Sequence, residues 1–341
     1  MADRPRATRR ATIYDVAARA GVSKSLVSLV LQNSPKVSAE RRQAVEAAMV
    51  ELDYRPSRAA TALAGSRSRT IGVVIDDFRN LWFVDLLDGL REVLGPAGLT
   101  LTVADLAGES ASSEADPGRA VIDGFVASAV DALVVACEPT PALLRPQGFP
   151  VVVAGNRSAT PPDAAVVSSD DSAGAEIAVR HLLDLGHRRI AHLTGGGGAS
   201  ALRLAAYERV LHDVGLTPHV ASGFGRTNEP DGYEAARRIL REAPDTTALF
   251  AGNDTMALGA LAAIREAGLD VPAGMSLMGF DNSPIADARI LRLTTVDSEN
   301  REVGRRAAQT VVDRLAGARV HRRQLVSPRL VLRDSTAPPR G

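Results

Sequence analysis

The chain has 341 residues, of which 45% are hydrophobic and 23% are charged, with a formal net charge of zero. This length predicts two or three domains, and the composition is typical of a globular protein rather than a fibrous or disordered one. The single cysteine, Cys137, excludes an internal disulfide and a cysteine-based metal cluster. The first residues lack the apolar core of a secretory signal, and no apolar run is long enough to span a membrane. We therefore expect a cytoplasmic protein.

The charges are unevenly distributed along the chain. Residues 1–70 hold 13 Lys and Arg against 6 Asp and Glu, whereas the remaining 271 residues hold 27 against 34. A basic N-terminal segment on an acidic remainder predicts contact with a polyanion such as nucleic acid. A solvated basic arm without any partner is the alternative, and charge alone leaves both open.

Residues 12–52 carry the signals of three short helices. The first begins with the capping pair Thr12 and Asp15 and continues in an apolar stripe formed by Ile13, Val16, Ala17 and Ala20. Gly21 ends this helix, because glycine tolerates the left-handed conformation of a tight turn. Ser23 caps a second helix with the stripe Leu26, Val27 and Val30. Ser38 caps a third helix with the stripe Val45, Ala48, Met49 and Leu52.

Two short helices around a glycine turn are the layout of a helix-turn-helix. The second helix would expose Lys24, Ser25, Ser28 and Leu29 near its start, where side chains reach base edges in the major groove. Lysine donates to guanine, serine bonds several bases, and leucine contacts the thymine methyl group. A plain three-helix domain fits the same pattern, so the pattern alone favours neither reading.

From residue 70 onward, short apolar runs alternate with helical patterns. The runs predicted as strands are 70–75, 99–104, 132–136, 150–154, 189–194, 248–252 and 276–280. Fully apolar strands that alternate with helices predict parallel sheets with helices on both faces. About 270 residues exceed one small sheet, so we expect two lobes, with a ligand crevice beyond the carboxyl ends of the strands.

Polar side chains from distant parts of the chain follow these strands. They are Asp76, Arg203, Asn253 and Asp281. Carboxylates and amides bind hydroxyl groups, and arginine offers a fork of donors. Trp82 and Phe83 come just after Asp76, and an aromatic ring there could stack on the apolar face of a ligand. Each polar residue alone fits a cap or a turn, but together they predict a ligand cleft.

Signals for other chemistry are weaker. The glycine run 195–198 lacks the Lys-Ser/Thr of a nucleotide-binding loop and predicts a flexible cleft loop instead. Asp76 and Asp281 could form a glycosidase pair, in which one acid donates a proton and the other attacks. The spacing of His181, His187 and His192 does not place them on one helical face. We expect no catalytic residues, no metal and no cofactor.

Residues 12–65, "TIYDVAARAGVSKSLVSLVL" through "VSAERRQAVEAAMVELDYRPSRAATALAG", resemble the DNA-binding head of the LacI/GalR family of bacterial transcriptional regulators. The likeness continues to about residue 333 through "LGHRRIAHLTG", "NDTMALGAL", "SLMGFDNS" and "LTTVDSE", which resemble the family's effector domain. This resemblance implies an all-α helix-turn-helix head on a two-lobed α/β body similar to periplasmic sugar-binding proteins. It divides the chain into a head (1–55), a hinge (56–69) and an effector-binding and dimerisation domain (70–341). The first lobe would comprise about 70–168 plus 299–327, and the second about 169–298 plus the C-terminus.

The resemblance also implies which residues meet DNA. They are Thr12, Tyr14, Ser23, Lys24, Ser25, Ser28, Leu29, Asn33, Ser57, Arg58, Ala60 and Leu63. Lys24, Ser25 and Leu29 would occupy the main base-reading positions. The linker 57–64 would become helical on DNA, with Leu63 wedged into the minor groove. Leu29 and Gln32 stand where the family often has Arg and Asn, which predicts a different operator half-site.

For the effector, the resemblance implies contacts from Asp76, Arg203, Asn253 and Asp281. The chain departs from the family at Gly155-Asn156, which replaces Asp-Arg, at Ala206, which replaces Gly, and at Thr227, which replaces an aromatic residue. Effector identity therefore stays open.

The implied function is that of a cytoplasmic, homodimeric or larger repressor of transcription. It would bind a palindromic operator in double-stranded DNA, and a small molecule between the lobes, a sugar first of all, would control that binding. A sugar-binding or carbohydrate-cleaving protein with an incidental basic arm is the alternative. The operator, the sign of regulation and the choice between dimer and tetramer stay open.

Overall fold

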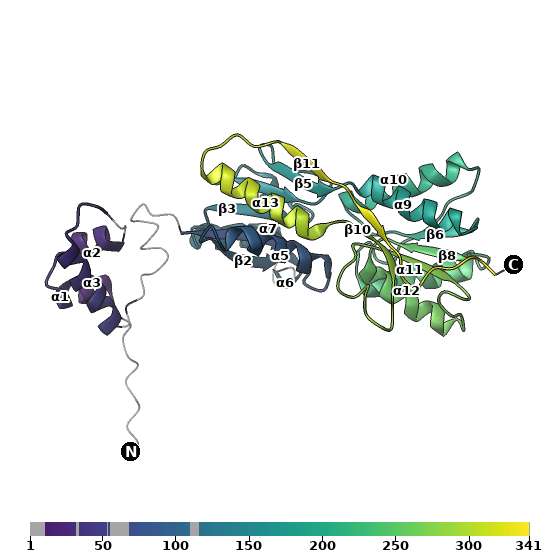
Figure 1. Ribbon diagram of the computed structural model, residues 1–341, viewed down its shortest axis with the longest axis horizontal. Helices are drawn as coiled ribbons and strands as arrows, with labels where there is room; N and C mark the ends of the chain where they lie inside the picture. The colour runs from purple at the N-terminus through teal and green to yellow at the C-terminus, as the bar shows by residue number, and fades with distance from the viewer. Residues whose placement is uncertain (1–10, 32–33, 53, 55–67, 110–115, 341) are drawn as a thin grey trace, which may run out of the picture. The chain divides into compact units, whose positions relative to one another are not determined.

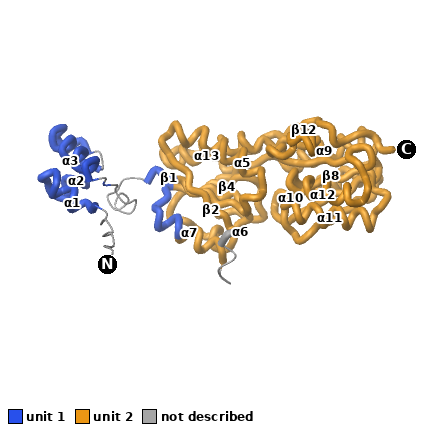
Figure 2. The backbone as a smooth tube through the Cα atoms, turned by 90° about the horizontal axis from the view of Figure 1, so that it is seen from below, with its two compact units in different colours: residues 1–70, 124–131 blue, residues 71–123, 132–341 orange. Residues whose placement is uncertain are grey.

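The computed structural model describes residues 11–31, 34–52, 54, 68–109 and 116–340. The chain divides into two compact units, residues 1–70 with 124–131 and residues 71–123 with 132–341 (Figure 2). Among the described residues, no helix is both long and apolar enough to cross a lipid bilayer.

Three helices of the first unit pack around one small core (Figure 1). They are α1 (Ile13–Arg19), α2 (Lys24–Leu31) and α3 (Ala39–Glu51). The predicted capping pair is confirmed, since the Asp15 N–H donates to Thr12 Oγ1 at 3.4 Å and the Thr12 N–H donates to Asp15 Oδ2 at 2.7 Å. Gly21 has the predicted left-handed conformation, with φ of +67°. The core residues Val16, Val27 and Val45 are fully buried, one from each helix, so the three-helix prediction is correct.

The second unit contains two six-stranded sheets. The first has the order β11-β5-β4-β3-β1-β2, and its strands are β1 (Thr70–Ile75), β2 (Thr100–Asp105), β3 (Ala132–Ala136), β4 (Val151–Ala154), β5 (Ala165–Ser169) and β11 (Arg323–Val326). Strands β11, β5, β4, β3 and β1 pair in parallel, as the apolar runs predict. The helices along this part of the chain are α5 (Trp82–Leu94), α6 (Leu106–Glu109), α7 (Pro117–Ala127), α8 (Pro141–Leu144) and α13 (Asn300–Leu315).

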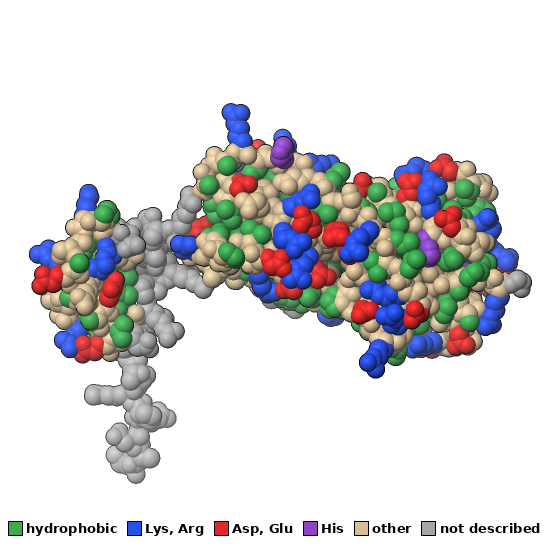
Figure 3. All heavy atoms as spheres, in the orientation of Figure 1, with side chains coloured by type: hydrophobic (Ala, Val, Ile, Leu, Met, Phe, Trp, Pro, Cys, Tyr) green, Lys and Arg blue, Asp and Glu red, His purple; other side chains and the backbone are tan. Residues whose placement is uncertain are grey.

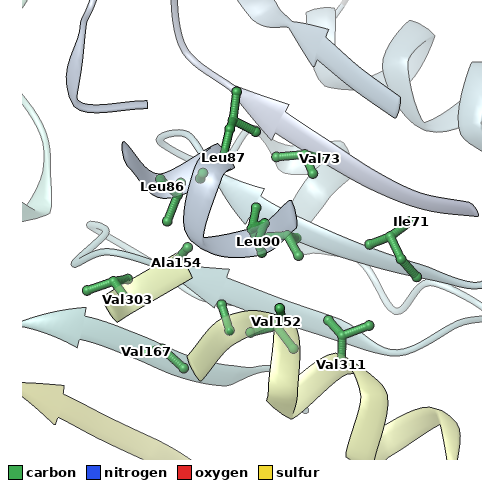
Figure 4. Packing of buried hydrophobic residues seen from close by; sticks show 14 of the residues in the cluster. Ile71, Val73, Leu86, Leu87, Leu90, Val152, Ala154, Val167, Val303 and Val311 are labelled. Atoms are coloured by element: carbon green, nitrogen blue, oxygen red, sulfur yellow. The ribbon is translucent and has the colours of Figure 1, made fainter. Parts of the chain in front are cut away.

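Helices α5 and α13 lie side by side on one face of the first sheet (Figure 1). Their outer surface carries neighbouring acidic and basic side chains (Figure 3), including Glu92 of α5, which pairs with Arg301 and with Arg305 Nη1 at 2.9 Å. Their inner surface packs Leu86, Leu90, Val303 and Val311 against the strands (Figure 4). The first sheet and these two helices form what we call the first lobe.

The second sheet has the order β12-β10-β9-β8-β6-β7. Its strands are β6 (Ile190–Leu193), β7 (His219–Ala221), β8 (Ala248–Ala251), β9 (Ser276–Phe280), β10 (Thr294–Asp297) and β12 (Arg329–Val331). All pairings are parallel except that of β12 with β10. Helices α9 (Asp171–Asp184) and α10 (Gly198–Asp213) cover one face, and α11 (Glu229–Glu242) and α12 (Asp254–Glu266) cover the other (Figure 1). These elements form the second lobe.

Within the described part of the body, three crossings of the chain join the two lobes. The first crossing lies between β5 and α9, the second between β10 and α13, and the third between β11 and β12. Arg329 ties two of these crossings together, because its guanidinium donates to Glu299 Oε1 at 2.7 Å and to Asp297 Oδ2 at 2.5 Å. The crossings follow the carboxyl ends of β5, β10 and β11, so these strand ends lie beside the segments that connect the two lobes.

Candidate functional site

A cleft that is partly open to solvent lies between the lobes. Concave sites lined by a few convergent polar groups are where small molecules commonly bind. Residues of both lobes line it, among them Asp76, Trp82, Arg203, Asn253 and Asp281. Five of the six predicted effector residues thus meet in one place. Their contact with an effector stays a prediction.

Arg203, in the first half of α10, forms the buried centre of the cleft wall. Its Nε donates to Asp171 Oδ1 at 2.7 Å, its Nη1 to the Gly252 carbonyl at 2.5 Å and its Nη2 to Asp281 Oδ1 at 3.5 Å. The guanidinium also lies 3.7 Å from the ring centroid of Phe280. Charge-assisted bonds of this kind hold a side chain in one orientation. Arg203 therefore presents its two carboxylate partners to the cleft in a fixed geometry.

Asp281 sits directly after β9 in a strained backbone conformation, with φ of +104°. Burial raises the pKa of Asp281 to about 6, Arg203 opposes this shift, and Asp171 adds to it. Ser298 Oγ donates to Asp281 Oδ1 at 3.4 Å. Strain persists only where surrounding contacts enforce it, and such positions gather at ligand sites. At neutral pH Asp281 is an ionised acceptor at the cleft wall.

Asp76 follows β1 on the opposite, first-lobe wall. Its Oδ1 accepts the Glu138 N–H at 2.8 Å, and among the described residues no donor reaches its second oxygen. Burial raises the pKa of Asp76, and the nearby Arg157 partly offsets that shift. The free oxygen is an acceptor positioned for a ligand hydroxyl.

Asn253 caps α12 and holds two loops of the cleft together. Its Oδ1 accepts the Met256 N–H at 2.8 Å, and its Nδ2 donates to the Thr227 carbonyl at 3.0 Å and to Asn80 Oδ1 at 3.5 Å. Asn80 in turn donates to Thr227 Oγ1 at 3.3 Å. Thr227, at the position where the family has an aromatic residue, thus contributes polar contacts between the lobes.

The adjacent aromatic residues Trp82 and Phe83 point into different surroundings, the cleft and the core. Trp82, at the start of α5, lines the cleft, and the Arg157 guanidinium lies 5.2 Å from its ring centroid. Phe83 is only 2% exposed and packs in the core of the first lobe. The prediction that Phe83 faces the ligand is therefore wrong, because one residue further along a helix turns the side chain by about 100°.

Sequence reasoning missed several cleft residues. They are Glu138, Asn156, Arg157, Ser169, Asp171, Ser298 and Asn300. Asn156 donates to Asp171 Oδ2 at 2.7 Å, so the departure at Gly155-Asn156 supports the Arg203 cluster. Two buried atoms at the cleft, Ser169 Oγ and Arg157 Nε, have no hydrogen-bond partner within the described chain. Buried polar atoms are normally paired, so a polar ligand would suit this part of the cleft.

The glycine run between β6 and α10 allows the lobes to approach. The Gly198 N–H donates to Glu138 Oε1 at 2.8 Å, and the same carboxylate accepts the Ser158 N–H at 3.0 Å. A Cβ on Gly198 would lie 2.3 Å from the Arg157 carbonyl carbon. The glycine is therefore required by close contact between backbones.

On the head, the predicted DNA-contacting side chains that are described lie on α1 and α2 or cap their first turns. Tyr14 of α1 is 64% exposed, Lys24 and Ser25 at the start of α2 are exposed, and Ser28 is half-buried. Thr12 and Ser23 serve as helix caps, and Leu29 packs partly against the head core. The remaining predicted residues lie outside the described part of the chain: Asn33, Ser57, Arg58, Ala60 and Leu63.

Two family models match the chain. Residues 12–57 match the bacterial regulatory proteins of the lacI family, and residues 179–336 match a periplasmic binding protein-like domain. The transcriptional regulator CelR of Thermobifida fusca is 31% identical over 96% of this chain and 98% of its own length. The lactose operon repressor of Escherichia coli K12 is 33% identical over 96% of this chain and 91% of its own length.

Solved structures give the same relationship. A lac repressor dimer bound to operator and the anti-inducer ONPF aligns with a TM-score of 0.76 at 27% identity, covering 96% of this chain and 100% of that one. A complex of the regulator CelR with cellobiose aligns with a TM-score of 0.67 at 27% identity, over 96% and 100%. The described architecture, a helical head and a two-lobed body with parallel sheets, agrees with both. The chain belongs to the LacI family of bacterial regulatory proteins.

Proposed function

We propose that this protein represses transcription by binding a palindromic operator, and that an uncharged sugar in the cleft controls that binding. The relatives are DNA-binding transcriptional regulators and not enzymes. The observation that carries the effector proposal is the set of unpaired buried polar atoms around the Arg203 cluster. Hydroxyl groups, which both donate and accept, are suited to Ser169 Oγ and to the free oxygen of Asp76.

The charges of the cleft favour a neutral ligand. Four carboxylates line it, those of Asp76, Glu138, Asp171 and Asp281, against two guanidinium groups. Arg203 is committed to two of the carboxylates, and Arg157 Nη2 donates to the carbonyls of Ala136 and Ala154 at 2.8 Å each. A phosphate would add negative charge to a wall that is already acidic, which is costly in a buried site. Trp82 offers a ring edge or face to the apolar side of a sugar.

The domain arrangement supports coupling between sugar and DNA. We place the operator-reading head at 1–55, the hinge with its minor-groove residue Leu63 at 56–69, and the effector body at 70–341. Two copies of the chain would read the two half-sites, because two tethered heads multiply their affinities. Binding at the lobes and binding at DNA would then be linked reciprocally. Bacterial DNA lies in the cytoplasm, which is the proposed compartment.

The role of Asp281 argues against carbohydrate cleavage. Its Oδ1 accepts hydrogen bonds from Arg203 and Ser298, so this oxygen is engaged by the wall of the cleft and is not free to exchange a proton with a glycosidic oxygen. A regulator without catalytic residues is the simpler proposal.

Selection of bound duplexes from a random DNA library, followed by anisotropy titrations in the presence of sugars, tests this function. We expect one recurring palindrome and release by one neutral sugar. A ligand at 100 times its dissociation constant should add about 2.7 kcal/mol of stability, which a thermal-shift screen detects. The affinity for random DNA should fall steeply with salt. Recovery of no preferred sequence would refute the proposal.

A further inference from the structure

Tyr14 and Lys24 make a contact that joins α1 to the first residue of α2. Lys24 Nζ donates to the Tyr14 hydroxyl oxygen at 3.2 Å, and the same nitrogen lies 5.0 Å from the centroid of the Tyr14 ring. Both side chains are solvent-exposed, and Tyr14 takes no part in the head core. The contact therefore does not serve the packing of the helices.

The positions of both residues follow from the two helix starts. The Thr12–Asp15 capping pair fixes the beginning of α1, in which Tyr14 is the second residue. Ser23 Oγ accepts the Leu26 N–H at 3.2 Å and fixes the beginning of α2, in which Lys24 is the first residue. The tyrosine ring has two side-chain torsions, whereas the lysine chain has four. The tyrosine is therefore the stiffer partner and can hold the ammonium group.

A neutral acceptor such as the Tyr14 hydroxyl is suited to holding the Lys24 ammonium group. A carboxylate would cancel the lysine charge, but a phenol oxygen occupies one of the three ammonium donors and leaves the charge intact. Immobilising a free lysine side chain on binding costs conformational entropy, because its four side-chain torsions lose their freedom. Prior orientation by Tyr14 reduces that cost and limits the bases that Lys24 can reach.

We propose that Tyr14 is a positioning residue for sequence recognition: it holds the Lys24 ammonium group so that its free donors meet the acceptors of one particular base pair. The inference rests on the proposed DNA-reading function and adds a second residue to the recognition of that base pair. Guanine, with its N7 and O6 acceptors, is the base such a donor reads best.

A double-mutant cycle on the full-length protein tests this proposal. The palindrome is first selected with the wild-type protein, and the base pair read by Lys24 is identified as the one whose discrimination Lys24→Ala abolishes. Affinities for the four variants of that base pair are then measured for the wild type, Tyr14→Phe, Lys24→Ala and the double variant. Phenylalanine keeps the ring and removes only the hydroxyl.

We expect Tyr14→Phe to lower discrimination at that one base pair by about threefold to tenfold, the usual effect of one hydrogen bond. In the Lys24→Ala background the same change should have no further effect on discrimination. Equal losses at every base pair, an unchanged discrimination, or an effect that persists without Lys24 would each overturn the proposal. Failure of the wild type to select any sequence would instead refute the underlying DNA-binding function.

Circular dichroism of each variant controls for folding of the head. Ser25→Ala, on the next exposed residue of α2, is the matched control. Its specificity change should fall at a different base pair, and Tyr14→Phe should add to it independently.

Discussion

Glu138 of the first lobe and Gly198 of the second are joined by a hydrogen bond of 2.8 Å, in which the N–H at the start of α10 donates to a carboxylate. A carboxylate is favoured at a helix N-terminus by the unpaired amide groups there. The glycine has no side chain to keep the neighbouring backbone of Arg157 away. This pair therefore marks a place where the backbones of the two lobes come into close contact.

Gly198→Ala should block that approach. Its Cβ would lie 2.3 Å from the Arg157 carbonyl carbon and 2.6 Å from the Ser158 nitrogen, which are backbone atoms that cannot turn aside. We expect a loss of at least tenfold in affinity for the sugar identified by screening, measured by calorimetry. Gly124→Ala is the control, because a Cβ there meets no atom within 4 Å. Unchanged sugar affinity in Gly198→Ala would show that closure at this point is irrelevant to binding.

Arg203→Ala should both destabilise the body and abolish the sugar response. Removal of the guanidinium leaves Asp171 and Asp281 buried without their partner, and breaking such a pair costs about 3–5 kcal/mol. Denaturant unfolding measures the loss. The matched control is Arg209→Ala on the same helix, whose exposed ion pair with Glu176 spans 3.2 Å and should contribute under about 1 kcal/mol. Similar losses in the two variants would contradict the role given to burial.

Trp82→Ala and Phe83→Ala should impair different properties, although the residues are neighbours. Trp82 lines the cleft, so its removal should weaken sugar binding more than stability. Phe83 is a core residue, and its removal should cost about 3–5 kcal/mol of unfolding free energy. Melting curves with and without sugar separate the two effects. A Phe83→Ala variant of normal stability would be incompatible with the described core.

Stability should fall as the pH rises from 7 to 8.5, because of Asp254. Burial, followed by repulsion from Asp281, raises the pKa of Asp254 to about 8, against 3.8 as the ordinary value. The native state therefore holds this proton more tightly than the unfolded chain, and stability is lost as the proton leaves. Burial lowers the pKa of His181, His187 and His192 below 6.5, so these groups are neutral in both states across this interval.

Asp254→Asn should flatten this dependence of the melting temperature on pH. Asp245→Asn, at a carboxylate that is 79% exposed, should leave it unchanged. A melting temperature of the wild type that is constant or rises between pH 7 and 8.5 would contradict the assignment.

The strands that could be predicted from sequence are those with uniform apolar runs. The seven predicted strands are all present, with ends that differ by one residue at most. The missed strands lack that signal, as in β7, where His219 and Val220 are exposed, and in β10, where the buried Thr294 and Thr295 read as polar. Pairing with a neighbour, and not side-chain pattern, makes these segments extended.

The sequence predicts those cleft residues that follow a strand with a recognisable apolar run. Asp76, Asn253 and Asp281 follow strands that the sequence predicts, whereas Ser169 ends β5 and Ser298 follows β10, two strands that the sequence does not predict. Glu138 lies one residue beyond Cys137, after a strand that was recognised, and its polarity there was the available signal. The unpaired buried atoms have no counterpart in the sequence, since only packing removes their access to water.

The crossings between the lobes have a consequence for how substitutions can give this protein a new ligand preference. Asp171 and Asn300 lie on segments that both line the cleft and connect the sheets. Under the proposed function, a substitution there should alter both which molecule is preferred and how easily the two lobes move against each other. Selectivity and amplitude of response would then be linked at these positions. New preferences that leave the response intact should arise first at Asp76 and Trp82, which stand on the wall and not on the connections.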